Sequence, residues 1–256
     1  MLIPFLGFIT GILIGLTGAG GGVILTPLLM LFTPYSAVVI IGTDIVNGAV
    51  TRLLGVIEHR RLGNVQARLA QWLILGSVPG TLGGVLLVRV LKTHLAAGQL
   101  DHVLKSALAV LLVGGGFILP WIRTKSNAAR PAPPRLERTS ERLRLAVVGA
   151  AVGFLVALTS VGSGSLLMIF LLLFIPLPLA ALVGTDLLFG LVTLALAGSL
   201  HMALGHFSAK LFVQLVVGSS LGVVLGSRLT TRIPERYFSW LFSILYFSLG
   251  ARLLVG

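Results

Sequence analysis

The stretch Gly15-Leu16-Thr17-Gly18-Ala19-Gly20-Gly21-Gly22 interrupts an apolar run that extends from residue 2 to residue 32. As a single helix this run would be about 46 Å long, whereas the hydrocarbon core of a bilayer is about 30 Å thick. The quoted stretch holds five glycines, and each glycine costs about 1 kcal/mol inside a helix. We therefore expect two short helices joined at the glycines, as either one broken, tilted span or a re-entrant hairpin.

The composition of the whole chain is typical of a protein that crosses a membrane several times. Of its 256 residues, 56% are hydrophobic and only 10% are charged, whereas soluble domains carry about 25% charged residues. The apolar runs are too long and too uniform for a membrane β-barrel. We predict an all-α polytopic membrane protein with apolar runs at residues 2–32, 36–57, 69–91, 103–122, 146–175, 178–204, 209–230 and 237–255.

The glycine-rich interruption returns, altered, 142 residues later at residues 157–165. The same offset matches many polar residues and glycines without a gap, and such matches are rarer than apolar identities in a chain of this composition. We predict two homologous membrane repeats, residues 1–122 and 145–256, joined by a basic, Pro-containing linker at residues 123–144. Among the matched residues are Gly11 with Gly153, Thr17 with Thr159, Gly42-Thr43-Asp44 with Gly184-Thr185-Asp186, and His59 with His201.

The distribution of charge bears on topology and location. The net charge of +12 comes from basic residues that cluster between apolar runs, as cytoplasmic loops do, so we expect a cytoplasmic linker and no nucleic-acid partner. Each repeat would have a broken or re-entrant first helix followed by three transmembrane helices. A hairpin gives three crossings and inverted repeats, whereas a single span gives four crossings and parallel repeats. The uncharged N-terminus favours inversion, and it lacks the positive region of a signal peptide.

The two interruptions suggest an anion site. A helix start presents free N–H groups and a partial positive charge, and two starts facing each other at mid-depth would bind an anion without a buried lysine. The second half-helices are expected to begin at about Gly22 and Ser165. Packing of helices through small residues is the alternative interpretation. The candidate substrate-binding residues are Thr17, Gly20, Gly21, Gly22, Thr159, Gly162, Ser163, Gly164 and Ser165, with Ser160 as a further hydroxyl donor.

Asp44 and Asp186 lie inside apolar runs at equivalent positions of the two repeats, in a chain with seven acidic residues. Charged residues at mid-bilayer are costly and usually functional. Because Arg52 lies near the end of its run and no other cation is central, we expect neutral, protonated carboxyls that relay protons or cations, with Thr43, Thr185 and Asn47 as polar neighbours. Alternatively, the carboxylates accept hydrogen bonds from the glycine-rich breaks. His59 and His201 are interpreted as interfacial residues at helix ends.

These features resemble the sulfite exporter TauE/SafE family, also called the sulfonate uptake permease family. The resemblance depends on Gly15–Gly22 followed by Thr26-Pro27, on the copy Thr159–Ser165, on the Gly-Thr-Asp after each broken run and on the basic linker. It implies a multi-pass transporter of the bacterial-type plasma (inner) membrane. Its candidate substrates are sulfite, sulfoacetate, sulfonates and small carboxylates. The two Asp residues depart from the small neutral polar residues that the resemblance leads us to expect there, which makes proton coupling worth testing.

The sequence therefore predicts a secondary transporter of a small anion, with proton or sodium coupling through Asp44 and Asp186. A passive anion channel, or a membrane-embedded enzyme or assembly factor, remains an alternative. No hydrolase arrangement or His-rich metal motif is present, and the chain has no Cys, so we expect neither catalysis nor a cofactor. The expected partners are the anion and the lipid bilayer, and a homo-oligomer is compatible with the sequence.

Overall fold

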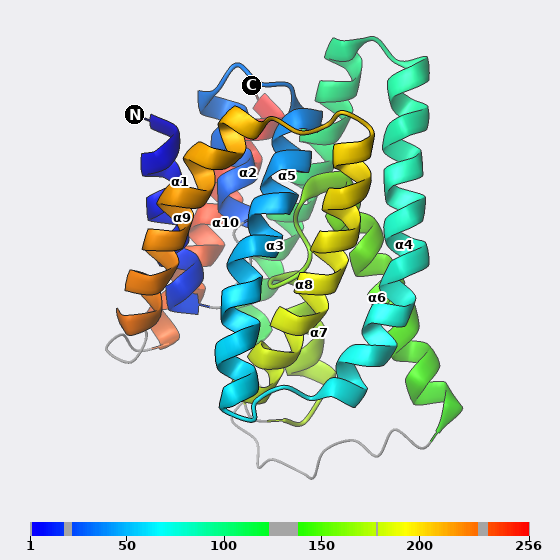
Figure 1. The fold of residues 1–256 in the computed structure, drawn as a ribbon, viewed down its shortest axis with the longest axis vertical. Coiled ribbons are helices and arrows are strands. Elements are labelled where there is room, and N and C mark those ends of the chain that lie inside the picture. Colours follow the sequence, from blue (N-terminus) through cyan, green and yellow to red (C-terminus); the bar gives the residue numbers. More distant parts are fainter. Residues whose placement is uncertain (1, 18–21, 123–137, 178, 230–234, 256) are drawn as a thin grey trace.

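A computed structural model describes residues 2–17, 22–122, 138–177, 179–229 and 235–255. All regular structure in these ranges is helical, as expected (Figure 1). The helices are α1 (Leu2–Thr17), α2 (Gly22–Phe32), α3 (Ala37–Arg61), α4 (Ala67–His94), α5 (Ala97–Ile122), α6 (Thr139–Thr159), α7 (Leu166–Phe174), α8 (Leu179–Ala203), α9 (Ala209–Leu229) and α10 (Glu235–Val255).

Both long apolar runs are divided at their glycine-rich stretches, as the sequence predicts. The first run forms α1 and α2, and the fifth forms α6 and α7. Helix α6 begins at Thr139, inside the range 123–144 that the sequence assigned to the linker. Its polar first turns are anchored because the Arg142 guanidinium lies over the Trp72 ring, 5.4 Å from the centroid. The stretch therefore contributes nearly two helical turns to the bundle.

Glycines allow two pairs of parallel helices to pack closely. Along α1 and α9, a Cβ at Gly7 would lie 3.0 Å from the Leu215 carbonyl oxygen, and one at Gly11 would overlap the backbone of Ser219. Along α4 and α6, Gly76 lies against Ala146 and Gly80 against Ala150, again with no room for a Cβ. Small residues are what membrane helices use to approach one another this closely.

The centre of the bundle is formed by α3 and α8, which lie side by side in Figure 1. They run antiparallel, since Gly48 faces Leu194 and Gly55 faces Leu187. Helices α5 and α10 are also antiparallel, with Gly116 beside Ser243 and Gly250 beside Ala109. The buried core gathers around these helices and includes Leu25, Ile40, Ile41, Ile45, Leu108, Leu112, Leu167 and Phe189.

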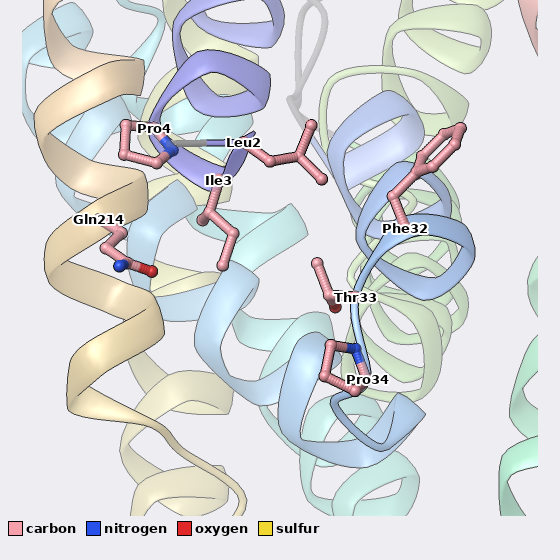
Figure 2. A pocket seen from close by; sticks show the side chains of 7 residues that line it. All are labelled: Leu2, Ile3, Pro4, Phe32, Thr33, Pro34 and Gln214. Carbon is pink, nitrogen blue, oxygen red and sulfur yellow. The ribbon is translucent and has the colours of Figure 1, made fainter.

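Helix α2 returns alongside α1. The first residues of α1 and the residues at the end of α2 line one apolar cavity, together with Gln214 of α9 (Figure 2). At 1.5 Å per residue, α1 and α2 are about 24 and 17 Å long, so neither reaches across a hydrocarbon core of about 30 Å. The cavity is lined by Leu2, Ile3, Pro4, Phe32, Thr33, Pro34 and Gln214.

Five helices are long and apolar enough to cross a membrane, among the residues that the structure describes. They comprise α3, α4, α6, residues 98–117 of α5 and residues 181–203 of α8, and shorter apolar helices occupy residues 2–14, 22–32 and 209–225. Large apolar side chains on these helices point outward, as lipid contact requires. Examples are Leu86, Val110, Phe117, Val147 and Leu221.

Candidate functional site

The start of α2 meets the second glycine-rich break. A Cβ at Gly22 would overlap the Ser160 carbonyl oxygen and would lie 2.9 Å from the Ser160 Oγ. The break itself turns through Ser160 (φ 63°), Gly162 (φ 145°) and Gly164 (φ 92°) before α7 begins at Leu166. Glycine adopts such positive φ angles without a steric penalty, whereas Ser160 pays for them. The two breaks, 142 residues apart in sequence, therefore form one junction.

The predicted substrate-binding residues are placed unequally at this junction. Gly22, Thr159 and residues 162–165 are described and buried or partly buried. The Thr159 hydroxyl donates to the Leu155 carbonyl oxygen of α6 at 2.8 Å, so its own helix occupies it. The Ser163 hydroxyl is buried and has no hydrogen-bond partner in the described part of the chain. Gly20 and Gly21 lie outside the described residues, as does the side chain of Thr17, which ends α1.

Asp44 of α3 ties the first helix pair to the second break. Its Oδ2 accepts hydrogen bonds from the Thr26 hydroxyl of α2 and from the Ser160 hydroxyl, the latter at 2.9 Å. The side chain is 2% exposed. One turn later, Asn47 Oδ1 accepts a hydrogen bond from the Ser219 hydroxyl of α9 at 2.8 Å. The partners of Asp44 among the described residues are thus neutral hydroxyls.

Thr43 and Thr185 hold the starts of two other helices. Thr43 Oγ1 accepts the N–H of Ser208, just before α9, at 3.1 Å. Thr185 Oγ1 accepts the N–H of Gln66, just before α4, at 3.2 Å. The two contacts are equivalent under the offset of 142 residues, because Thr43 matches Thr185 and Gln66 matches Ser208. These hydroxyls fix α9 and α4 against α3 and α8, so their contacts differ from those of the neighbouring carboxylates.

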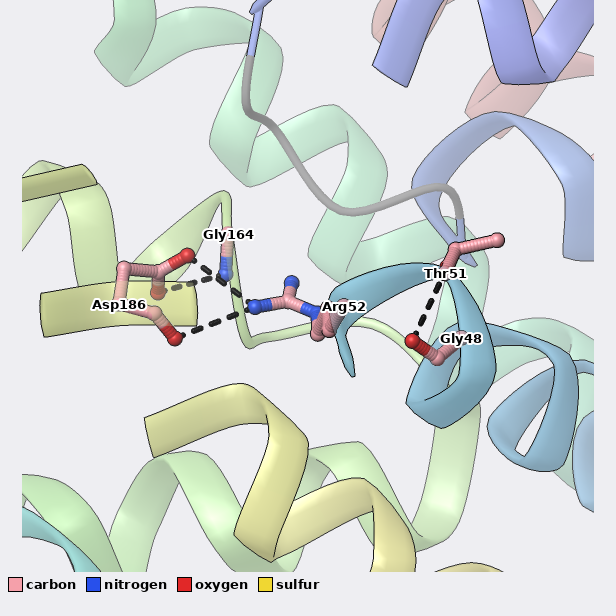
Figure 3. Close-up of polar contacts among 5 residues, drawn as sticks. All are labelled: Gly48, Thr51, Arg52, Gly164 and Asp186. Atoms are coloured by element: carbon pink, nitrogen blue, oxygen red, sulfur yellow. Dashed lines mark hydrogen bonds and ion pairs between the residues drawn. The ribbon is translucent and has the colours of Figure 1, made fainter. Parts of the chain in front are cut away.

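Asp186 of α8 is paired with a buried cation (Figure 3). The Arg52 Nη1 lies 3.2 Å from Asp186 Oδ2 and 3.2 Å from the Asp186 carbonyl oxygen. The Gly164 N–H in the second break donates to Asp186 Oδ1 at 2.9 Å. The side chains of Arg52 and Asp186 are 6% and 0% exposed. The expectation that Asp186 has no cationic partner is therefore wrong.

The error came from the position of Arg52. The apolar run ends near residue 57, but α3 continues through Arg61, so Arg52 lies within the packed helix instead of at its end. The antiparallel α8 then places Asp186 beside it. The only signal in the sequence was Arg52 itself, a cation inside an apolar run with no acidic residue within one helical turn.

His201 is more buried than an interfacial residue. It lies near the end of α8, as expected, but its Nε2 is 2.9 Å from the Ala157 carbonyl oxygen and its Nδ1 is 3.1 Å from the Nδ1 of His206. A carbonyl oxygen only accepts hydrogen bonds, so Nε2 of His201 carries the proton, and the neutral ring accepts from His206 Nδ1–H. Burial, together with the positive charge of Lys92, lowers the pKa of His206 to about 4.

Comparison with known proteins places this arrangement in a family. Residues 3–253 match the family described as sulfite exporter TauE/SafE. The chain belongs to the sulfite exporter TauE/SafE family. It is 30% identical over 254 residues to "Probable membrane transporter protein YjnA" of Bacillus subtilis (strain 168), covering 98% of each chain. It is 28% identical to "Probable membrane transporter protein YdhB" of the same strain, over 92% of each chain.

A relative also occurs in another bacterium. "Probable membrane transporter protein" of Xylella fastidiosa (strain Temecula1 / ATCC 700964) is 26% identical over 236 residues, covering 88% of this chain and 84% of the relative. No solved structure matches the chain. The protein is thus a multi-pass member of a membrane-transporter family with bacterial relatives, and the family implies transport instead of enzymatic catalysis. The resemblance noted in the sequence is confirmed.

Proposed function

We propose that this TauE/SafE protein is a secondary transporter of a small sulfur-containing or organic anion of the sulfite, sulfonate or sulfoacetate class. The observation that carries the proposal is the contact between Gly22 and Ser160, which joins the two breaks beside two buried carboxylates and a buried guanidinium. The anion would bind between the starts of α2 and α7. Donors would come from Thr17, Gly20, Gly21, Gly22, Gly162, Ser163, Gly164 and Ser165, and Thr159 would join them by releasing the Leu155 carbonyl oxygen.

An inverted repeat would supply the alternating access. Equivalent helices of the two repeats, α3 with α8 and α5 with α10, run antiparallel, whereas a parallel duplication would orient them alike. The pairing of helices across the repeats supports their equivalence, because α1 packs on α9 as α6 packs on α4. The protein would lie in the bacterial plasma membrane with its linker, residues 123–144, on the cytoplasmic side.

The directions in which α1, α3 and α9 run support re-entrant hairpins. The contacts of Thr43 with Ser208 and Asn47 with Ser219 run in the same order along α3 and α9, so these helices are parallel. Helix α1 is also parallel to α9, and therefore to α3. Because α1 and α3 point the same way, α2 between them must run back, which leaves three crossings in the first repeat. Rocking of one repeat against the other would then expose the junction alternately.

The charges at the junction favour coupling to a cation. Asp44, Asp186 and Arg52 are all buried, and with both carboxylates ionised they sum to one negative charge. An added anion would be repelled strongly at low dielectric. A proton or sodium ion bound at Asp44, among the neutral hydroxyls of Thr26 and Ser160, would remove that repulsion. We therefore assign coupling to Asp44 and Asp186.

Reconstitution into proteoliposomes tests the proposal. Uptake of labelled sulfite, methanesulfonate and sulfoacetate is measured with a pH gradient, with a sodium gradient and with neither. Saturable uptake that one gradient drives is the expected result, whereas flux that rises linearly with concentration indicates a passive channel. Failure of every anion to cross would overturn the transport function.

The coupling role has its own variants. Asp44→Asn keeps an oxygen that accepts from Thr26 and Ser160, so we expect a folded protein whose uptake no longer accumulates substrate against a gradient. Asp101→Asn is the matched control, since Asp101 accepts the Ala37 N–H at 2.9 Å, away from the junction, and it should leave coupling intact. Unchanged gradient-driven uptake in the double variant Asp44→Asn/Asp186→Asn would refute the coupling assignment.

A further inference from the structure

Arg52 is a buried cation at the junction that the transport function described above does not use as a ligand. Building on that function, we propose that Arg52 binds the charged group of the substrate, and that Asp186 occupies Arg52 when substrate is absent. The ligand class is an oxyanion with at least two oxygens on one central atom, such as sulfite, a sulfonate or a carboxylate. Asp186 is then an internal competitor for the substrate site.

The guanidinium of Arg52 has unused hydrogen-bonding capacity. Both of its hydrogen bonds, to the Asp186 carboxylate and to the Asp186 carbonyl oxygen, use Nη1. A guanidinium has five N–H donors, yet Nη2 and Nε make no hydrogen bond with any described residue. Strong pairs of Arg with a carboxylate usually form two parallel bonds. Arg52 therefore holds Asp186 by one nitrogen and keeps a fork of donors for another oxyanion.

Ser163 supplies a second unused donor at the same place. Its hydroxyl is buried without a hydrogen-bond partner in the described chain, and the residue is 4% exposed. A Cβ at Gly190 would overlap both the Ser163 Oγ and the Arg52 Nη1, so the Ser163 hydroxyl lies beside the guanidinium group above Gly190. An unpaired buried hydroxyl costs about 1–3 kcal/mol. An oxyanion that accepts from both groups would remove this cost.

The contacts of Asp186 resemble those that a substrate anion would make. One carboxylate oxygen accepts the Gly164 N–H in the second break and the other accepts from Arg52 (Figure 3). A backbone N–H near a helix start and a guanidinium are both ordinary ligands for small oxyanions. When a substrate takes these donors, the Asp186 carboxylate loses its counter-charge. This exchange gives a structural reason for a cation to enter with the anion.

Two variants distinguish a role of Arg52 as substrate ligand from a purely structural role of the Arg52–Asp186 ion pair. Arg52→Gln/Asp186→Asn removes both charges together and so avoids the lone buried charge that a single Arg52 variant would leave. Asp186→Asn removes only the competitor and leaves Arg52 cationic. Arg60→Gln, at the exposed end of α3, is the control. Each protein is purified in detergent, and its thermal stability is measured with increasing sulfite and methanesulfonate, followed by uptake in proteoliposomes.

The expected results differ in direction between the two variants. Asp186→Asn should bind sulfite at least about tenfold more tightly than the native protein, because the Asp186 carboxylate no longer competes with sulfite for the charge-assisted bond to Arg52. Sulfite should therefore raise its thermal stability more than it raises that of the native protein. Arg52→Gln/Asp186→Asn should fold but bind sulfite at least about tenfold more weakly. Arg60→Gln should match the native protein in both measurements.

The opposite pattern would overturn the inference. If Arg52→Gln/Asp186→Asn binds and transports with native affinity, the ion pair is only structural, although the transport function stands. If that double variant does not fold, Asp186→Asn decides the matter, since a structural pair predicts lower stability without tighter binding. A native protein that neither binds nor transports any of the anions would overturn both the function and the role of Arg52.

Discussion

The seam between α4 and α6 provides a sharp test of the packing, because two glycines on one helix face different surroundings. A Cβ at Gly80 would lie 2.7 Å from the carbonyl carbon and 2.8 Å from the Cα of Ala150. A Cβ at Gly83 would come no closer than 3.8 Å to Phe154. Restoring a carbon–carbon distance of about 3.5 Å at Gly80 requires the helices to separate by at least about 0.8 Å, and clearing the overlap with the Ala150 carbonyl oxygen requires more.

The magnitude follows from comparing Gly80→Ala with Gly83→Ala. Each substitution gains about 0.5–1 kcal/mol from the lower backbone entropy of alanine, and this gain cancels in the comparison. Overpacking against rigid backbone costs about 1–3 kcal/mol, and only Gly80→Ala incurs it. At about 2–4 °C per kcal/mol for a protein of this size, we expect Gly80→Ala to melt roughly 2–12 °C below Gly83→Ala.

Thermal unfolding in one detergent, followed by the fraction that remains monodisperse after heating, measures this difference. The native protein is run beside both variants, and Gly83→Ala should equal or slightly exceed it. Equal melting temperatures for Gly80→Ala and Gly83→Ala would refute the close parallel packing of α4 on α6. If Gly83→Ala melts below Gly80→Ala, the face of α4 that packs on α6 has been assigned wrongly.

Two further predictions concern the second break and the loop before α9. Ser160→Gly should be more stable than Ser160→Ala by about 1 kcal/mol. Both variants lose the hydrogen bond to Asp44, but only alanine keeps the cost of the left-handed backbone. Equal stability of the two variants would contradict the left-handed conformation at residue 160. The pKa of His206 is about 4 in the folded protein, below its ordinary value of about 6.5. The unfolded chain therefore takes up the proton first, and stability should fall as pH drops from about 6.5 toward 4. His206→Asn, which places the residue type of Asn64 at this position, should lose less melting temperature than the native protein between pH 7.5 and pH 5, and an identical loss would contradict the role of His206.

Local properties of the chain were enough to predict the fold class and the broken helices. Apolar length relative to bilayer thickness, and the cost of glycines within a helix, are additive along a short segment, so Gly15–Gly22 indicated two helices without any tertiary information. The same holds for the equivalent break, where α7 begins at Leu166, one residue after the predicted start. Family membership could also be predicted from the sequence, because the glycine-rich breaks recur with their flanking polar residues.

The partners of the buried charges were decided by tertiary structure. Arg52 and Asp186 are 134 residues apart, and they meet only because α3 extends beyond its apolar run and packs antiparallel to α8 in one register. Asp44 likewise reaches Ser160 of the other break, a contact that its own neighbours do not indicate. Hydropathy and residue type determine whether a segment enters the membrane. Which buried donor faces which carboxylate depends on helix direction and register, which are set by the close approach of whole helices at glycines such as Gly11 and Gly80.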